Sequence, residues 1–206
     1  MADEKKAVEK PLKKLFWLDM EMTGLDENTD VILEVAVIIT DMGMNELARY
    51  EAIVYQPPEA VAAMNEWCKK THGDSGLTKL IPDGTPLKKV EADLIALATQ
   101  HFNKKERIIL CGNSIGNDRR FIDKYMKDFA ALLHYRLVDV SSFKEIFKSK
   151  FGINFQKKNA HRAIGDICES IEELKTYLSF ISVDNPQKIK GTCLTSKNQP
   201  SSWPVF

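Results

Sequence analysis

Three strand-like segments joined by short turns open the chain, and they constrain its fold more than any other feature of the sequence. Residues 15–18 form an apolar run long enough for a buried strand, residues 31–40 are rich in valine and isoleucine, and residues 46–55 alternate loosely. Residues 23–26 indicate a turn between the first two segments. Because short connections join antiparallel neighbours, we expect the fold to open with an antiparallel meander.

Helical periodicity dominates the rest of the chain and is interrupted by two short apolar runs. The pattern predicts helices over residues 59–70, 87–102, 115–126 and 164–180, and buried strands over residues 108–111 and 136–140. We expect Ser141 to cap a further helix, and residues 74–86, which contain Gly, Pro and Ser, to form a loop. This order of elements predicts an α/β fold, with a five-stranded mixed sheet flanked by helices on both faces.

The length of 206 residues fits one globular domain with terminal extensions. The charged first segment predicts a flexible extension over residues 1–13, and the domain is expected to span residues 14–181. Residues 182–206 contain three prolines and several Ser, Lys and Asn, so we expect a loosely attached tail.

The charge balance limits the kinds of nucleic-acid partner that the chain could hold. Lys plus Arg and Asp plus Glu number 29 each, which argues against a broad basic face that grips long nucleic acid through many phosphate contacts. An enzyme for nucleic acid stays possible, because a substrate with few phosphates needs few cations and bound metal ions add positive charge.

The cysteines and the termini indicate an intracellular protein. Cys68, Cys111, Cys168 and Cys193 are far apart and contain no CxxC pair, so we expect reduced thiols rather than a zinc site. No segment is apolar enough to predict a membrane span, and the N-terminus has no apolar core of a signal peptide. A cytoplasmic protein is the expectation, with an additional mitochondrial pool left open.

The first candidate site is a pair of acids at the end of the first strand. Asp19 and Glu21 are two residues apart, and strand side chains alternate, so both project from one face. Two bare carboxylates would repel each other, and a divalent cation such as Mg²⁺ or Mn²⁺ would relieve the repulsion. The alternative is a strand end at which both acids face water.

Three further residues lie at the edges of predicted elements. Asp118 falls in the first turn of a helix after a short strand, His161 precedes the last predicted helix, and Asp166 falls in its first turns. Taken singly, the two acids are explained by favourable interaction with a helix dipole, and the histidine by a surface or capping position. Their order along the chain, DxE, D and HxxxxD, is far more specific than any of them alone.

This constellation resembles that of the DEDDh exonucleases, a branch of the ribonuclease H-like fold. The longer motifs are similar to those of the oligoribonuclease family: WLDMEMTGLD at residues 17–26, CGNSIGNDRRF at residues 111–121, HYRLVDVS at residues 134–141 and HRAIGDICES at residues 161–170. The resemblance covers about residues 14–181 and implies a ribonuclease H-like α/β fold.

The resemblance also implies a mechanism. Asp19, Glu21, Asp118 and Asp166 would hold two divalent ions, Mg²⁺ or Mn²⁺, beside the scissile phosphate. His161 would act as the general base toward the attacking water, because its ordinary pKa suits proton transfer at neutral pH. The products would be nucleoside 5′-monophosphates released from the 3′ end of very short RNA.

Substrate contacts are implied as well. Leu25 would wedge between the two terminal bases, Trp67 and Tyr135 would stack on bases, and His72 would touch substrate. Residue pattern alone favours core packing for Trp67, which shares a predicted helical face with Val61 and Met64, and a loop position for His72.

Ser114, Arg136 and Ser141 resemble a polar cap on the 5′ phosphate, which would restrict the enzyme to short RNA. In this family Tyr135 and Arg136 reach the active site of the other subunit, so a homodimer is implied. A surface ion pair is the plainer interpretation of Arg136, and an ordinary strand start that of residues 134–136.

Two other functions stay open at this stage. A longer-substrate DEDDh exonuclease would use the same five residues but would need a basic track and an open groove. A catalytically silent RNA-binding or scaffold protein on this fold is less favoured, because all five site residues are present.

Overall fold

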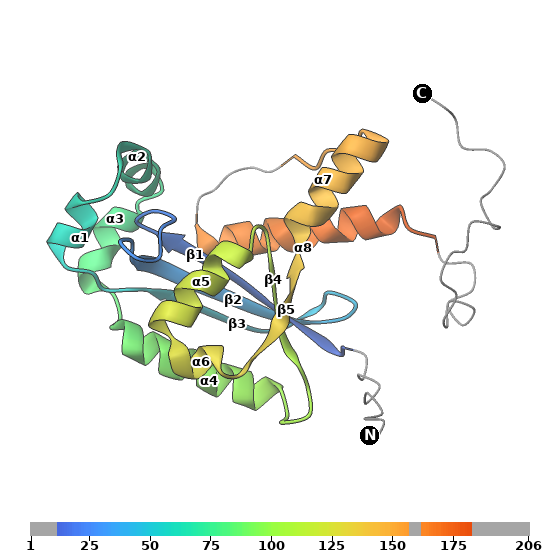
Figure 1. The fold of residues 1–206 in the computed structure, drawn as a ribbon, viewed down its shortest axis with the longest axis horizontal. Helices are drawn as coiled ribbons and strands as arrows, with labels where there is room; N and C mark the ends of the chain where they lie inside the picture. Colours follow the sequence, from blue (N-terminus) through green and yellow to red (C-terminus); the bar gives the residue numbers. More distant parts are fainter. Residues whose placement is uncertain (1–11, 157–161, 183–206) are drawn as a thin grey trace, which may run out of the picture.

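The computed structural model describes residues 12–156 and 162–182 (Figure 1). His161, residues 1–11 of the predicted N-terminal extension and residues 183–206 of the predicted tail lie outside this part of the chain. The domain boundaries proposed from the sequence stay a prediction.

Five strands form one mixed sheet. They are β1 (Lys14–Met22), β2 (Ile32–Asp41), β3 (Glu46–Ile53), β4 (Ile108–Gly112) and β5 (Leu133–Asp139). Their order across the sheet is β3-β2-β1-β4-β5. The first three strands pair antiparallel, as the meander predicts, whereas β4 runs parallel to both β1 and β5. The predicted five-stranded mixed sheet is confirmed.

Helices fill most of the remaining described chain. They are α1 (Pro58–Ala62), α2 (Glu66–Asp74), α3 (Leu77–Leu80), the 3₁₀ helix η1 (Ile81–Asp83), α4 (Leu87–His101), α5 (Gly116–Tyr125), α6 (Lys127–Ala130), α7 (Val140–Phe151) and α8 (Ala163–Ser179). In the ranges that the structure describes, none of these helices combines the length and apolar character needed to cross a membrane.

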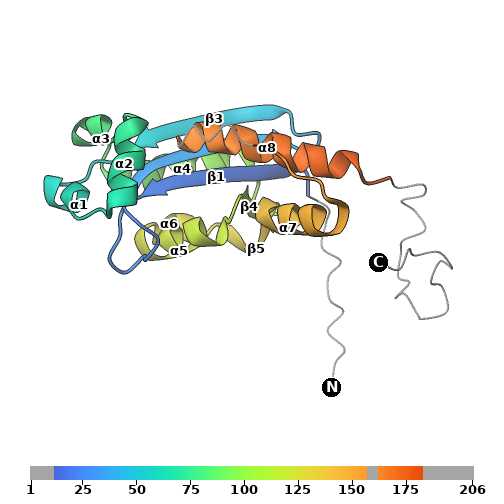
Figure 2. The ribbon, with the colours of Figure 1, turned by 90° about the horizontal axis from the view of Figure 1, so that it is seen from above.

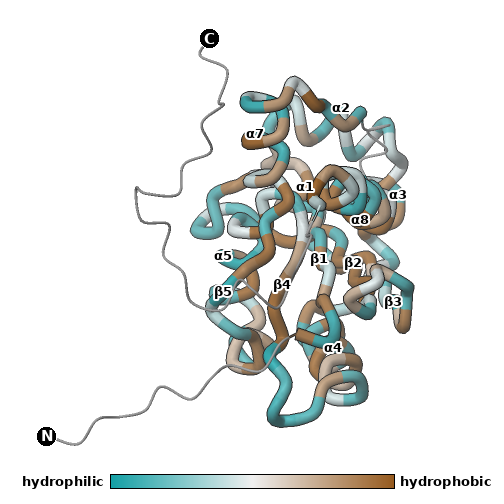
Figure 3. Tube along the Cα trace, turned by 90° about the vertical axis from the view of Figure 1, so that its right-hand side faces the viewer, coloured by the Kyte–Doolittle hydropathy of each residue, from teal (hydrophilic) through white to brown (hydrophobic). Residues whose placement is uncertain are grey.

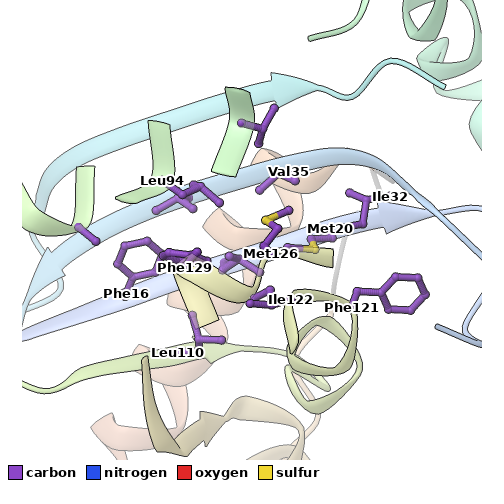
Figure 4. Close-up of a cluster of buried hydrophobic side chains, with 14 of the residues drawn as sticks. Phe16, Met20, Ile32, Val35, Leu94, Leu110, Phe121, Ile122, Met126 and Phe129 are labelled. Carbon is purple, nitrogen blue, oxygen red and sulfur yellow. The ribbon is translucent and has the colours of Figure 1, made fainter. Parts of the chain in front are cut away.

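The alternation of side chains along β1 explains why helices cover both faces of the sheet. Phe16, Leu18 and Met20 belong to a buried cluster that includes side chains of α4, α5 and α6 (Figure 4). Leu15 and Trp17 point the other way, into a second cluster with α7 and α8. Figures 1 and 2 show α8 and α4 on opposite sides of the strands. The expectation of helices on both faces is therefore confirmed.

The inner strands of the sheet are largely buried. All five residues of β4 are buried, and in Figure 3 hydrophobic residues (brown) run along this strand while peripheral loops are hydrophilic (teal). Gly112, the last residue of β4, lies so close to β1 that an added Cβ would stand 2.8 Å from the carbonyl oxygen of Leu18. Only glycine allows the two strands to approach this closely.

The prediction of one helix over residues 59–70 is wrong. Helix α1 ends at Ala62 and α2 begins at Glu66. Between them, the side chain of Asn65 accepts a hydrogen bond from the backbone N–H of Cys68 at 2.8 Å and so caps α2. The apolar periodicity continued across this break, which hid it from pattern analysis.

Two further local predictions need correction. The segment predicted as a loop, residues 74–86, contains α3 and η1. Asp139 rather than Ser141 caps α7, because its carboxylate accepts from the backbone N–H of Ser141 at 2.9 Å. Ser141 therefore lies inside the first turn of α7, where its hydroxyl is available for other contacts.

Candidate metal and substrate site

The C-terminal ends of β1, β4 and β5 meet at one edge of the sheet, because the three strands run parallel. Functional groups of α/β sheets gather at such an edge. Here it carries Asp19 and Glu21 near the end of β1, Gly112 at the end of β4 and Asp139 at the end of β5.

Three acids converge at this edge. Asp19 and Glu21 lie on the α8 side of β1, and Asp166 lies in the first turn of α8. Carboxylate oxygens of the three residues lie within 4.8 Å of one another. All three side chains are partly buried.

A partly buried ion pair holds the start of α8 against the sheet. Glu34 on β2, which is paired in register with Glu21, is 1% exposed and accepts from Arg162 through two nitrogens, with Nη2–Oε1 at 2.7 Å and Nε–Oε2 at 3.1 Å. The backbone N–H of Ala163 also donates to Glu34 at 3.2 Å. Arg162 immediately precedes α8, so this pair fixes the end of the helix that presents Asp166.

Asp118 approaches β1 from α5. β4 pairs with β1 only as far as Cys111, and beyond this point the backbone N–H of Met20 donates to the Asp118 carboxylate at 3.0 Å. Asp118 thus takes the place of a strand neighbour and lies against the residue between Asp19 and Glu21. It is 5% exposed, so its carboxylate is buried at the start of α5 rather than on the outer surface of the helix.

Burial disfavours the charged forms of two of these acids. It raises the pKa of Glu21 to about 7, with the charges of Asp166 and Glu34 adding to the shift and that of Arg162 opposing it. Burial also raises the pKa of Asp118 to about 8, and backbone N–H donors, including that of Met20, oppose this shift. These carboxyl groups lie close together and resist ionisation when no cation is bound. Such a set of oxygen ligands fits a hard divalent cation, which would stabilise the charged carboxylates.

His72 lies next to this cluster. It is 1% exposed on α2, its Nε2 lies 3.0 Å from the carbonyl oxygen of Met22, and its Nδ1 lies 3.8 Å from Oε2 of Glu21. The carbonyl can only accept, so Nε2 carries a proton. The alternative of a loop histidine is wrong, and the ring is fixed beside the acid cluster.

The turn that carries Leu25 is tightly constrained. Asp30 accepts from the hydroxyl of Thr23 at 2.9 Å and from the backbone N–H of Asp26 at 3.0 Å. A Cβ at Gly24 would lie 2.7 Å from the Asp30 carboxyl carbon, so any side chain here would displace this carboxylate from its hydrogen bonds. Leu25 at its tip is 62% exposed, as a residue that contacts substrate would be.

The same turn is anchored to α5. Arg120 donates to the carbonyl oxygen of Leu25 at 3.1 Å. Tyr125 lies within hydrogen-bond distance of the carbonyl oxygens of Glu27 and Asp30, with the shorter contact, 2.8 Å, to Asp30. The exposed leucine is therefore held by rigid surroundings.

Trp67 is an exposed side chain. It is 64% accessible, whereas Met64, which the helical pattern placed on the same face, is 3% exposed. The core-packing interpretation is therefore wrong. The pattern misplaces Trp67 because it assumes one continuous helix, whereas the break at Asn65 starts a new helix.

Ser114 and Ser141 are brought together by Asp139. The backbone N–H of Ser114 donates to Asp139 at 3.0 Å and to the Ser141 hydroxyl at 2.9 Å, and the two hydroxyl oxygens lie 3.2 Å apart. Ser114 has φ of 50°, which is unfavourable for a residue other than glycine and is maintained by these contacts. Two serines predicted from separate motifs thus form one polar site.

Tyr135 and Arg136 lie on β5, the edge strand, and both are exposed. Tyr135 is 74% accessible, and the guanidinium carbon of Arg136 lies 5.4 Å from the centre of its ring. His161, the predicted general base, lies outside the described residues, whereas Arg162 and Ala163 beside it are held by Glu34.

Sequence reasoning missed the residues that support the site. They are Glu34, Asn113, Asp139, Arg162 and Glu173. A charged residue inside the apolar run of β2 was a usable signal for Glu34, because an unpaired buried charge is costly. The partners of the others depend on tertiary contacts that no local pattern shows.

Comparison with known proteins gives consistent matches. A family model described as Exonuclease matches residues 16–174. The oligoribonuclease of Francisella tularensis subsp. tularensis (strain WY96-3418) is 45% identical over 165 residues, covering 79% of this chain and 93% of that protein. The human protein named "Oligoribonuclease, mitochondrial" is 40% identical over 181 residues, covering 85% of this chain and 76% of that protein.

Solved structures show the same fold at lower identity. E. coli exonuclease I in complex with a dA16 oligonucleotide has a TM-score of 0.61 and 15% identity, covering 81% of this chain. The zinc-bound complex of E. coli exonuclease I with single-stranded DNA has a TM-score of 0.56 and 16% identity, covering 82% of this chain. In both cases the match spans 41% of the exonuclease I chain.

Proposed function

The chain belongs to the oligoribonuclease family of DEDDh exonucleases, and from this membership we propose that it is a 3′→5′ exoribonuclease that hydrolyses RNA of a few nucleotides, down to dinucleotides, to nucleoside 5′-monophosphates. The observation that carries the proposal is the convergence of Asp19, Glu21 and Asp166 at the edge of the sheet, with Asp118 beside them. The family model matches residues 16–174, a range that contains the positions of all four acids.

The four acids would hold divalent ions, Mg²⁺ or Mn²⁺. When bound, such ions lower the pKa of a water molecule and stabilise the oxygen that leaves. In this chain Glu34 and Arg162 would keep Asp166 in place, and His161 would accept the proton of the attacking water.

The rest of the predicted site would bind the substrate. Leu25 and Trp67, both exposed, would contact the terminal bases, and stacking on an aromatic ring is worth about 1–3 kcal/mol per base. Ser114 and Ser141 would hold the 5′ phosphate of the substrate. His72 would contact the substrate from its fixed position beside Glu21.

We extend the proposal to a homodimer in which Tyr135 and Arg136 complete the site of the partner subunit. The exposed position of both residues on the edge strand supports it, because a second subunit could reach them there. The equal numbers of basic and acidic residues fit a substrate with few phosphates.

A length series tests this function. Release of 5′-monophosphates is measured on RNA and DNA of two to twenty nucleotides with Mg²⁺ or Mn²⁺. We expect the highest kcat/KM for RNA of two to five nucleotides. A strong preference for the longest substrates, or for DNA, would reject the short-RNA assignment. Absence of any hydrolysis would favour a silent binding protein.

A pair of variants on α8 tests the site. Asp166→Asn should lower kcat by more than about a hundredfold, since even changes to residues behind metal ligands cost about 10–100-fold. Glu172→Gln is the matched control, because it removes one negative charge from the exposed side of the same helix. Equal activity of both variants would contradict the assignment of Asp166.

A further inference from the structure

A chain of polar contacts, buried at its α8 end, connects α8 to the two serines of the predicted phosphate site. Glu173 is fully buried, and its carboxylate accepts from the hydroxyl of Tyr177 at 2.8 Å and from Nδ2 of Asn113 at 3.0 Å. Oδ1 of Asn113 lies 3.2 Å from the hydroxyl of Ser141. The chain ends at Ser114, whose backbone N–H donates to the Ser141 hydroxyl oxygen.

The direction of each hydrogen bond in this chain is fixed by chemistry. The Glu173 carboxylate can only accept. The hydroxyl of Ser170 donates to the carbonyl oxygen of Asp166 at 2.7 Å, so its oxygen is left to accept from Nδ2 of Asn113 at 2.7 Å. The amide group of Asn113 must therefore direct its NH₂ toward α8 and its oxygen toward Ser141.

This orientation decides what the two serines can do. The hydroxyl proton of Ser141 is committed to Asn113, so its oxygen presents lone pairs to Ser114. Ser114 has no such commitment to α8, and its hydroxyl proton can turn from Ser141 toward an anion. An anion is stabilised only by the serine that has a proton to donate.

We propose that Asn113, which Glu173 holds in its orientation, is a positioning residue for recognition of the 5′ phosphate, which acts through Ser141 and makes Ser114 the serine that donates to the phosphate. The inference rests on the proposed function and adds the residues that set its preference for a phosphorylated 5′ end. It also links this preference to the helix that carries Asp166.

The experiment compares a dinucleotide that carries a 5′ phosphate with the same dinucleotide that carries a 5′ hydroxyl. The wild-type chain should prefer the phosphorylated form. Asn113→Ala should reduce this preference about tenfold, as expected for one lost hydrogen bond to a charged group. The loss should appear in KM for the phosphorylated dinucleotide, with kcat and both constants for the hydroxyl form nearly unchanged.

Matched variants separate positioning from stability. Tyr177→Phe removes one hydrogen bond from Glu173 but leaves the contact between Asn113 and Ser141, so it should lower the melting temperature and keep the preference. Glu173→Gln keeps an oxygen for Asn113 and should also keep the preference. Asn113→Asp keeps the side-chain shape but has no donor for Ser170 or Glu173, and its carboxylate is repelled by that of Glu173, so the side chain leaves the orientation that serves Ser141 and the preference should be lost. It provides a second variant if Asn113→Ala does not fold.

A double-mutant cycle decides whether Asn113 acts through Ser141. Ser141→Ala should lower the preference, and adding Asn113→Ala to it should have no further effect. The inference would be overturned if Asn113→Ala had the same effect in the wild-type chain and in the Ser141→Ala variant. It would also be overturned if Asn113→Ala by itself kept the full preference. Either result would leave the proposed function intact. A wild-type chain that hydrolyses both dinucleotides equally would refute the phosphate site and this inference, while its exoribonuclease activity would stand.

Discussion

Glu21 and Asp118 are acids whose ordinary charge is opposed by their surroundings. Their pKa values rise from 4.5 to about 7 and from 3.8 to about 8, in both cases chiefly through burial. At a pH between the ordinary and the raised pKa values, the folded chain without metal therefore binds more protons than the unfolded chain. The stability that comes from this stronger proton binding is present at low pH, and it is lost as the pH rises through the folded-state pKa values of Glu21 and Asp118.

The first prediction follows for the metal-free protein. In EDTA the melting temperature should fall as the pH rises from 6 to 8.5, and Mg²⁺ or Mn²⁺ should raise it more at pH 8.5 than at pH 6, because a cation competes with protons. Differential scanning fluorimetry measures this. Asp118→Asn should weaken the pH dependence in EDTA. A metal-induced increase of equal size at both pH values would contradict the prediction.

The second prediction concerns Trp67, whose exposure separates binding from stability. Trp67→Ala should change the free energy of unfolding by less than about 0.5 kcal/mol, as exposed substitutions do. It should raise KM for a dinucleotide by about 5–150-fold through lost stacking. Met64→Ala is the control, because removal of this buried side chain should cost about 2–5 kcal/mol of stability. Strong destabilisation by Trp67→Ala would restore the core interpretation.

At the scale of elements, the start of α8 depends on its ion pair with β2. Glu34→Gln leaves Arg162 without its charged partner and loosens the helix end that presents Asp166. We expect kcat to fall about 10–100-fold, as for other residues that orient metal ligands. Glu51→Gln on β3 is the control, since Glu51 is exposed and also influences Arg162 electrostatically. Equal kinetics of the two variants would show that the pair does not position Asp166.

Most elements could be predicted from the sequence, because their patterns are local. The strands of the meander and the helices over residues 87–102, 115–126 and 164–180 follow from hydrophobic periodicity. The break at Asn65 and the cap at Asp139 could not be predicted from this periodicity, because a side-chain cap sets the end of a helix without interrupting the apolar pattern. Caps depend on one hydrogen bond, which periodicity does not register.

The candidate site divides in the same way. The acids Asp19, Glu21 and Asp166 were predicted together because their motifs are long, and the structure brings them together. The contacts of Glu173 with Asn113 could not be predicted, since 60 residues separate the two positions and only the packing of α8 brings them into contact.

At the scale of the whole molecule, the proposed dimer makes a prediction about mixed subunits. Asp19→Ala and Arg136→Ala should each be nearly inactive alone on dinucleotides. If Arg136 serves the partner's site, a mixed dimer contains one intact site. Mixing equal amounts after unfolding and refolding should then restore about one quarter of wild-type activity, because about half of the dimers are mixed and half of their sites intact.

Subunit mixing has a clear opposite outcome. No recovery of activity, with dimers detected by light scattering, would show that Arg136 acts within its own chain. Monomers that are fully active would reject the dimer itself. A mixture of Asp19→Ala with Asp166→Asn provides the control, because both residues belong to one subunit's site and mixing should restore nothing.

The ion pair between Glu34 and Arg162 also bears on the biosynthesis of the protein. During translation, the strands that carry Asp19, Glu21 and Glu34 leave the ribosome long before α8 is made, and domains tend to fold as their chain emerges. Until Arg162 arrives, Glu34 lacks its partner and the acid cluster lacks Asp166. A nascent chain would therefore stay inactive toward RNA, including the messenger that encodes it, until α8 has docked.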